Sequence, residues 1–127
     1  MDQIEFYEAK LSYETDSWDL FEAIKSQESI IVVDARSKET FKTEHIPTAV
    51  SIPHKTMSEL TTGHLDKSKT YVTYCDGIGC NASTKGALKL AKSGFQTKEL
   101  LGGLDWWKRD GYATEGEQKT QGKSITD

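Results

Sequence analysis

The chain has two cysteines, Cys75 and Cys80, and both lie in a glycine-bearing segment between an expected strand and an expected helix. A thiolate is a strong nucleophile, but a thiol with an ordinary pKa of about 8.5 is only slightly ionised at neutral pH. Amides at the start of a helix favour an anion, and Gly77 and Gly79 would let the backbone turn its amides inward. The pattern predicts a reactive Cys75 with a lowered pKa.

The segment after Cys75 is the expected substrate-binding loop. Its amides could surround the thiolate or a charged group bonded to the thiol. The alternative interpretation is structural: Cys75 would be a small buried residue at a strand end, and the glycines would form an ordinary turn. The loop consists of Asp76, Gly77, Ile78, Gly79, Cys80 and Asn81.

The elements that must position this loop alternate between strands and helices. Short β-branched or apolar runs predict strands at 30–33, 46–53, 70–75 and 97–103. Helical spacing and capping residues predict helices at 16–26, 38–44, 56–65, 81–95 and 104–112. This alternation is typical of a doubly wound, parallel α/β sheet, in which ligands bind beyond the carboxyl ends of the strands. Cys75 lies at such an end.

Length and composition predict one domain at 1–112 and a polar, disordered tail at 113–127. The net charge is −4 with both signs interspersed, so we expect neither a nucleic-acid nor a membrane partner. The acidic N-terminal residues do not suit a signal peptide, and the expected location is cytoplasmic. Cytosolic thiols are kept reduced, so a permanent disulfide is not expected.

Segments on both sides of the cysteine loop resemble the signatures of rhodanese-like domains. The first is a strand followed by Asp34-x-Arg36, a short helix and His45-Ile46-Pro47. The second is a glycine pair before an aromatic helix, here Gly102, Gly103 and Trp106 or Trp107. The resemblance spans roughly 18–112, and it implies a mainly parallel five-stranded sheet with helices on both faces.

What the resemblance implies is sulfur transfer by a thiosulfate or persulfide sulfurtransferase. Cys75 would accept a sulfane sulfur as a persulfide and pass it to a thiophilic acceptor. The partners would be a small sulfane-sulfur donor and a thiol or protein acceptor, with no organic cofactor and no metal. Asp34, Arg36 and His45 would support the loop structurally. We expect a monomer or a weak dimer.

This loop departs from the family pattern in ways that bear on the donor. It is longer than the usual loop, contains no arginine, and carries an acidic residue at Asp76. The first cation after the loop is Lys85. A less positive pocket would bind thiosulfate poorly, so a small thiol persulfide or a protein persulfide is the expected donor.

A non-catalytic function stays open, whereas a phosphatase function fails on its chemistry. Cys80 could resolve a Cys75 persulfide or form a disulfide with Cys75 if their Cα atoms lie within about 7 Å; it could equally pack as an inert residue. In a non-catalytic module, the same pair would sense redox state or serve binding. A cysteine-dependent phosphatase would need an arginine to clamp the oxyanion, but Asn81 stands at the Cys-x5-Arg position.

Overall fold

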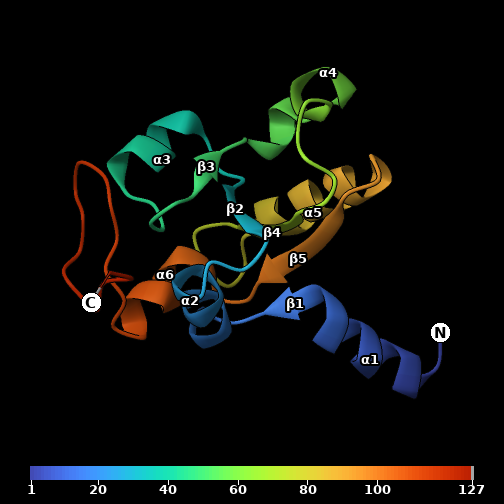
Figure 1. Cartoon of the computed structure of the whole chain (residues 1–127), viewed down its shortest axis with the longest axis horizontal. Coiled ribbons are helices and arrows are strands. Elements are labelled where there is room, and N and C mark those ends of the chain that lie inside the picture. Colours follow the sequence, from blue (N-terminus) through green and yellow to red (C-terminus); the bar gives the residue numbers. More distant parts are fainter. Residues whose placement is uncertain (127) are drawn as a thin grey trace.

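A computed structural model describes residues 1–126, which form a five-stranded sheet flanked by helices (Figure 1). Every strand pairing in this part of the chain is parallel. The strand order is β1 (Glu14–Thr15), β5 (Gln96–Leu100), β4 (Thr70–Tyr74), β2 (Ile30–Asp34) and β3 (Val50–Ser51). The predicted parallel α/β fold is confirmed.

Helices cover both faces of the sheet. On one face, α2 and α6 pack through Phe21 and Trp107, whose ring centroids lie 6.1 Å apart. On the other face, Leu90 of α5 packs in a cluster with Val33 and Tyr71. The helical elements are α1 (Gln3–Tyr13), α2 (Ser17–Lys25), α3 (Lys38–Thr43), the 3-10 turn η1 (His54–Thr56), α4 (Glu59–Thr62), α5 (Ala82–Lys92) and α6 (Gly103–Arg109).

Helix starts follow from the predicted capping residues. The Asp16 carboxylate accepts the amide of Asp19 and begins α2, and the Ser37 hydroxyl accepts the amide of Thr40 and begins α3. In α6 the adjacent tryptophans diverge as helical geometry requires: Trp107 is buried and Trp106 is 41% exposed.

The first two elements, α1 and β1, were not predicted from the sequence. Helix α1 begins at the Asp2 cap, buries no residue, and projects from the edge of the sheet (Figure 1). Strand β1 is too short to show a hydrophobic pattern. Its pairing with β5 supplies the fifth strand.

The C-terminal segment differs from the prediction of a disordered tail. Residues 113–126 fold back onto the domain, where His45 and Glu115 exchange backbone hydrogen bonds and Ile125 packs against the core. The carboxylate of Glu44 accepts hydrogen bonds from the hydroxyls of Thr114 and Thr120. The tail is held mainly by polar contacts, which its composition does not reveal. The predicted tail also included Asp127, which lies outside the described residues.

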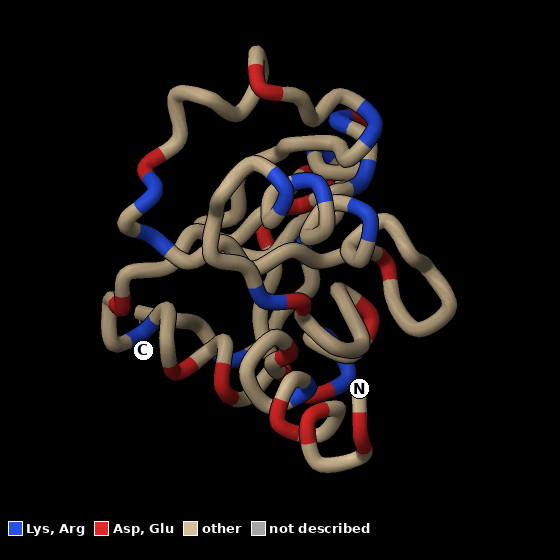
Figure 2. Tube along the Cα trace, turned by 90° about the vertical axis from the view of Figure 1, so that its right-hand side faces the viewer, with Lys and Arg blue, Asp and Glu red and all other residues tan. Residues whose placement is uncertain are grey.

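Charges of both signs are interspersed over the face drawn in Figure 2. Among the described residues, no helix combines the length and apolar character that crossing a membrane requires.

Candidate active site

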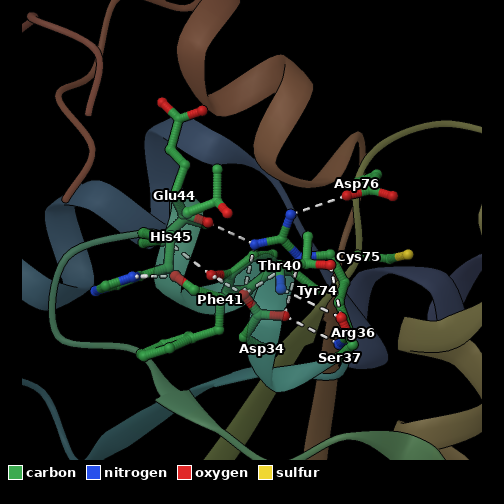
Figure 3. Close-up of polar contacts among 12 residues, drawn as sticks. Asp34, Arg36, Ser37, Thr40, Phe41, Glu44, His45, Tyr74, Cys75 and Asp76 are labelled. Atoms are coloured by element: carbon green, nitrogen blue, oxygen red, sulfur yellow. Dashed lines mark hydrogen bonds and ion pairs between the residues drawn. The ribbon is translucent and has the colours of Figure 1, made fainter. Parts of the chain in front are cut away.

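Cys75 follows the last residue of β4, at the carboxyl edge of the sheet, and is buried. Its side chain points away from the Asp34–Arg36 pair beside it (Figure 3). Its sulfur is bonded to the sulfur of Cys80, with the two Cα atoms 6.2 Å apart. The pairing that the sequence left open is therefore present, and both cysteines belong to one site.

The start of the loop is fixed by helix α6. The amide of Leu104 donates to the Cys75 carbonyl at 3.0 Å, and the amide of Asp105 donates to the Asp76 carbonyl at 2.8 Å. Gly103 lies against the same backbone, because a Cβ there would overlap the Cys75 carbonyl oxygen and approach the Gly77 nitrogen at 2.9 Å. Gly103 of the second signature thus permits this close packing.

The rest of the loop has fewer supports. Within it, the amide of Cys80 donates to the Gly77 carbonyl at 3.2 Å, and Gly79 adopts a positive φ of 94°. Ile78 is 81% exposed. Asn81 caps α5 by position, but its side chain makes no capping hydrogen bond. The first amides of α5 are therefore not occupied by that side chain and can face an anion.

Asp34 and Arg36 form a buried network behind the loop (Figure 3). The Arg36 guanidinium donates to both carboxylate oxygens of Asp34, to the backbone carbonyl of Glu44 at 2.7 Å, and to the Asp76 carboxylate at 2.8 Å. The Tyr74 hydroxyl donates to Asp34 at 2.8 Å. Arg36 thus joins the end of β2 to Asp76 through its side-chain hydrogen bonds.

The same network shifts the pKa values of Arg36 and Tyr74. Burial lowers the pKa of Arg36, but the hydrogen bonds and charge of Asp34 outweigh burial and raise that pKa overall. Burial raises the pKa of Tyr74, and the neighbouring Asp34 carboxylate raises it further. The tyrosine therefore stays a neutral donor, and the arginine stays charged.

His45 serves the turn after α3 and does not line the cysteine pocket. Its Nδ1 lies 2.7 Å from the Phe41 carbonyl oxygen, and its ring stacks on the Phe41 ring at 3.9 Å. The next amide, that of Ile46, donates to the Tyr74 hydroxyl at 3.0 Å. His45 is thus a hydrogen-bonded residue of the turn after α3.

A pocket of about 530 Å³ opens beside the two cysteines. Its wall combines residues 35–40 after β2, residues 53–56 after β3, and the loop after β4, so the carboxyl ends of three strands meet there. Lys38, His54 and Lys55 line it together with Cys75 and Cys80. Sequence reasoning missed these three residues, because they come from loops that only the sheet topology brings together.

Lys85, the cation expected nearest to the loop, does not line the pocket, and the pocket wall carries the acidic residues Glu39 and Asp76 as well as basic residues. Lys38 and Lys55 are part of the wall itself. Burial lowers the pKa of His54, and the positive charges of Lys89, Lys85 and Lys55 lower it further. His54 is therefore neutral at neutral pH, with its buried Nδ1 unpartnered among the described residues.

Metal binding was not expected, and the donor set gives it little support in the oxidised state. The side chains of Cys75, Asp76 and Cys80 offer donor atoms that all lie within 4.8 Å of one another. Thiolates are the metal ligands that cysteine supplies, and the disulfide removes both of them.

Comparison with known proteins identifies the family. The model of the rhodanese-like domain matches residues 17–110, and the chain belongs to that family. The BH2092 protein of Bacillus halodurans is 46% identical, with a TM-score of 0.88 over 94% of this chain and 88% of that one. A comparison with curated proteins found no match.

Two further solved structures show how far the likeness extends. The rhodanese-like domain of the Alr3790 protein from Anabaena is 26% identical, with a TM-score of 0.74 over 83% of this chain and 80% of that one. A Rhodopseudomonas palustris protein described as a possible tyrosine phosphatase is 24% identical, with a TM-score of 0.64 over 81% of this chain and 85% of that one. At that identity the likeness concerns the fold alone.

Proposed function

We propose that this protein is a sulfurtransferase or persulfide carrier that moves sulfane sulfur through Cys75. The observation that carries the proposal is the setting of this thiol. Cys75 is held at the carboxyl end of β4 and lines a pocket that also contains Lys38 and Lys55. Helix amides and lysines both favour a thiolate and a terminal persulfide anion.

The transfer proceeds in two displacements without net oxidation. The Cys75 thiolate attacks the sulfane sulfur of the donor, a new S–S bond forms, and the donor's remaining group leaves with the electron pair. An acceptor thiolate then attacks the outer sulfur of the Cys75 persulfide, and the electron pair of the broken bond returns to Cys75. Before the first turnover a dithiol must reduce the Cys75–Cys80 disulfide, because a disulfide sulfur is no nucleophile.

The donor is expected to be anionic. Lys38 and Lys55 line the pocket, and Arg36 is already engaged by Asp34 and Asp76. Thiosulfate and small-molecule persulfides both carry negative charge, so the lysines favour both. Without a free arginine to bind an oxyanion bidentately, activity toward thiosulfate is expected to be the weaker of the two.

A phosphatase function has little support from this site. Cysteine phosphatases hold the phosphoryl oxygens with an arginine that presents a planar pair of donors. Arg36 donates instead to Asp34, Asp76 and the Glu44 carbonyl. A non-catalytic redox module remains the second candidate, because the disulfide joins the two thiols of the chain.

Mass spectrometry of the loaded protein tests the proposal. Reduced Cys80→Ser protein, incubated with thiosulfate or with cysteine persulfide, should gain the mass of one sulfur atom on Cys75. Cys75→Ser protein should gain none, because a hydroxyl cannot hold sulfane sulfur. No sulfur on Cys75 with either donor would contradict the proposal and leave the redox module as the function.

A further inference from the structure

Cys80 is close enough to Cys75 to react with whatever that thiol carries. Their Cα atoms lie 6.2 Å apart and their sulfurs are bonded, and the distance is within the range that disulfides require. Both side chains line the same pocket. When the pair is reduced, Cys80 is therefore a second thiol at the point where Cys75 would receive sulfur.

The two cysteines differ in how firmly the fold holds them. The backbone of Cys75 is bound by the amide of Leu104, which begins a packed helix. Cys80 comes after Gly79, which has a positive φ and open space around its Cα, and its own amide bonds only within the loop, to Gly77. If a sulfur atom is added to Cys75, Cys80 can adjust its position while Cys75 stays in place.

We propose that Cys80 is a resolving thiol that releases the sulfur of a Cys75 persulfide as hydrosulfide. This inference rests on the proposed Cys75 persulfide. The Cys80 thiolate attacks the Sγ of Cys75, and the Cys75–Cys80 bond forms. The bond from Cys75 Sγ to the outer sulfur breaks, and that sulfur leaves with the electron pair as hydrosulfide. In this step the Cys80 sulfur is oxidised and the outer sulfur is reduced, while the oxidation state of Cys75 Sγ is unchanged.

Positive groups near the outer sulfur favour its departure. The leaving sulfur bears negative charge, and the pocket contains Lys38 and Lys55 beside the first turn of α5. A thiol tethered within the same loop also reacts as if at a very high concentration, compared with a dissolved acceptor. Release should therefore outpace transfer to a small external thiol whenever Cys80 is reduced.

The disulfide of this structure is the product that the step would leave. A dithiol reductant must then restore both thiols, with the electrons that convert sulfane sulfur to hydrosulfide. The protein would thus convert sulfane sulfur to hydrosulfide at the expense of a dithiol. A reaction that produces persulfides or other sulfane sulfur must precede it.

The test follows loading and release separately. Wild-type, Cys80→Ser and Cys80→Ala proteins are reduced, freed of reductant under anaerobic conditions, and treated with one equivalent of cysteine persulfide. Mass spectrometry measures sulfur on Cys75, and a hydrosulfide assay measures release. Wild type should release hydrosulfide and form the Cys75–Cys80 disulfide. Both variants should keep the persulfide and release hydrosulfide at least about tenfold more slowly.

The outcomes separate this inference from the proposed function. Variants that load sulfur on Cys75 but release hydrosulfide as fast as wild type would overturn the resolving role and leave sulfur transfer intact. Variants that acquire no sulfur on Cys75 would overturn the proposed function itself. Sulfur on Cys80 in Cys75→Ser protein would reverse the roles of the two thiols and contradict both.

Discussion

The two halves of the cysteine loop are built differently. The first half, Cys75 and Asp76, is bound by backbone amides of α6 and by the Arg36 guanidinium. Among the described residues, the second half, residues 78–81, is attached by one backbone hydrogen bond, from the Cys80 amide to the Gly77 carbonyl. Its other attachments are the disulfide and its continuation into α5. We call them the anchored half and the free half. The anchored half carries the proposed nucleophile, and the free half carries the proposed resolving thiol.

This difference suits the roles proposed for the two thiols. A nucleophile must stay aligned with the amides and lysines that stabilise its charge, so tertiary contacts that fix its backbone are useful. A resolving thiol must approach the persulfide after sulfur has been added, and before that it must leave the nucleophile accessible to the donor. Flexible backbone at Gly79 serves the second purpose.

The anchor of the first half extends well beyond the loop. The Arg36 guanidinium bonds to the Glu44 carbonyl, and the Glu44 carboxylate holds Thr114 and Thr120 of the C-terminal segment. Burial raises the pKa of Glu44, but hydrogen bonds from Thr114, Thr120 and Lys108 outweigh burial and lower it. The C-terminal segment is thus linked to Asp76 through a continuous set of polar contacts.

Replacing Arg36 with methionine should produce the largest loss of stability. The carboxylate of Asp34 is fully buried, and of its described donors it would keep only the Tyr74 hydroxyl and the backbone amide of residue 36. Removing one partner of such a buried pair costs about 3–5 kcal/mol. A urea titration of the unfolding free energy measures this loss.

Arg109→Met is the matched control for that variant. Arg109 donates to Asp105 at 3.0 Å, but both side chains are largely exposed, so its loss should cost less than about 1 kcal/mol. Equal losses in the two variants would show that burial of the Asp34–Arg36 pair does not anchor the first half of the loop.

Truncation after Tyr112 should have the next largest effect. It removes the Ala113 carbonyl that accepts from the buried Trp107 indole, and it removes the hydroxyl donors of Glu44. Buried polar groups left unpaired cost about 1–3 kcal/mol each, so we expect a total of about 2–4 kcal/mol. The chain without residues 1–13 is the control, and because α1 buries no residue it should lose less than about 1 kcal/mol.

Acid should reduce the difference in unfolding free energy between the full-length chain and the chain truncated after Tyr112. The lowered pKa of Glu44 contributes stability that is fully present above the ordinary glutamate pKa of about 4.3. That contribution is lost as the pH falls through the lowered value in the folded chain. Urea titrations at decreasing pH measure this difference in unfolding free energy. A difference that stays constant into strong acid would mean that Glu44 does not hold the C-terminal segment.

Alanine at Gly103 and at Gly79 compares the two halves directly. Both glycines have positive φ, so each substitution carries backbone strain. At Gly103 the new Cβ would also overlap the Cys75 carbonyl, whereas at Gly79 no atom lies within 4 Å of it. We expect losses of about 2–3 kcal/mol at Gly103 and about 1 kcal/mol at Gly79 in thermal unfolding. A larger loss of stability at Gly79 than at Gly103 would mean that the free half of the loop is the more constrained of the two.

Much of the fold could be predicted because its central strands carry a clear signal. The run at 30–33 is β-branched and lies in the middle of the sheet. Strand β1 gave no such signal, because Glu14 and Thr15 pair with β5 at the edge of the sheet. The docked C-terminal segment was missed for a related reason: hydrogen bonds to Glu44 hold it, and they depend on tertiary structure.

The site could be predicted in part. Cys75, Asp34 and Arg36 were identified by motifs that are continuous in the sequence. Lys38 and Lys55 were not, because they follow different strands and meet the cysteines only where the sheet brings three loops together. Local spacing therefore points to the proposed nucleophile, but which charged residues line its pocket depends on topology.

Asp76→Asn should change stability by less than about 1 kcal/mol, because its ion pair with Arg36 is largely exposed on the aspartate side. The variant removes a negative charge next to Cys75, which favours the thiolate. In a Cys80→Ser background, Cys75 should then be alkylated faster by iodoacetamide at pH 7 than with Asp76 present. A slower reaction would mean that the anchoring of the loop by Asp76 favours the thiolate more than the negative charge of Asp76 disfavours it.

Ile78→Ala should have the smallest effect. The side chain is 81% exposed and lies in the free half of the loop, so its truncation should change the unfolding free energy by less than about 0.5 kcal/mol. Ile46→Ala is the matched control, since Ile46 is fully buried in the core and loses the same atoms at a cost of about 2–5 kcal/mol. If Ile78→Ala approached that cost in a urea titration, Ile78 would have to pack on the domain in solution. The second half of the loop would then be anchored too, and Cys80 would lack the freedom that its proposed approach to a persulfide requires.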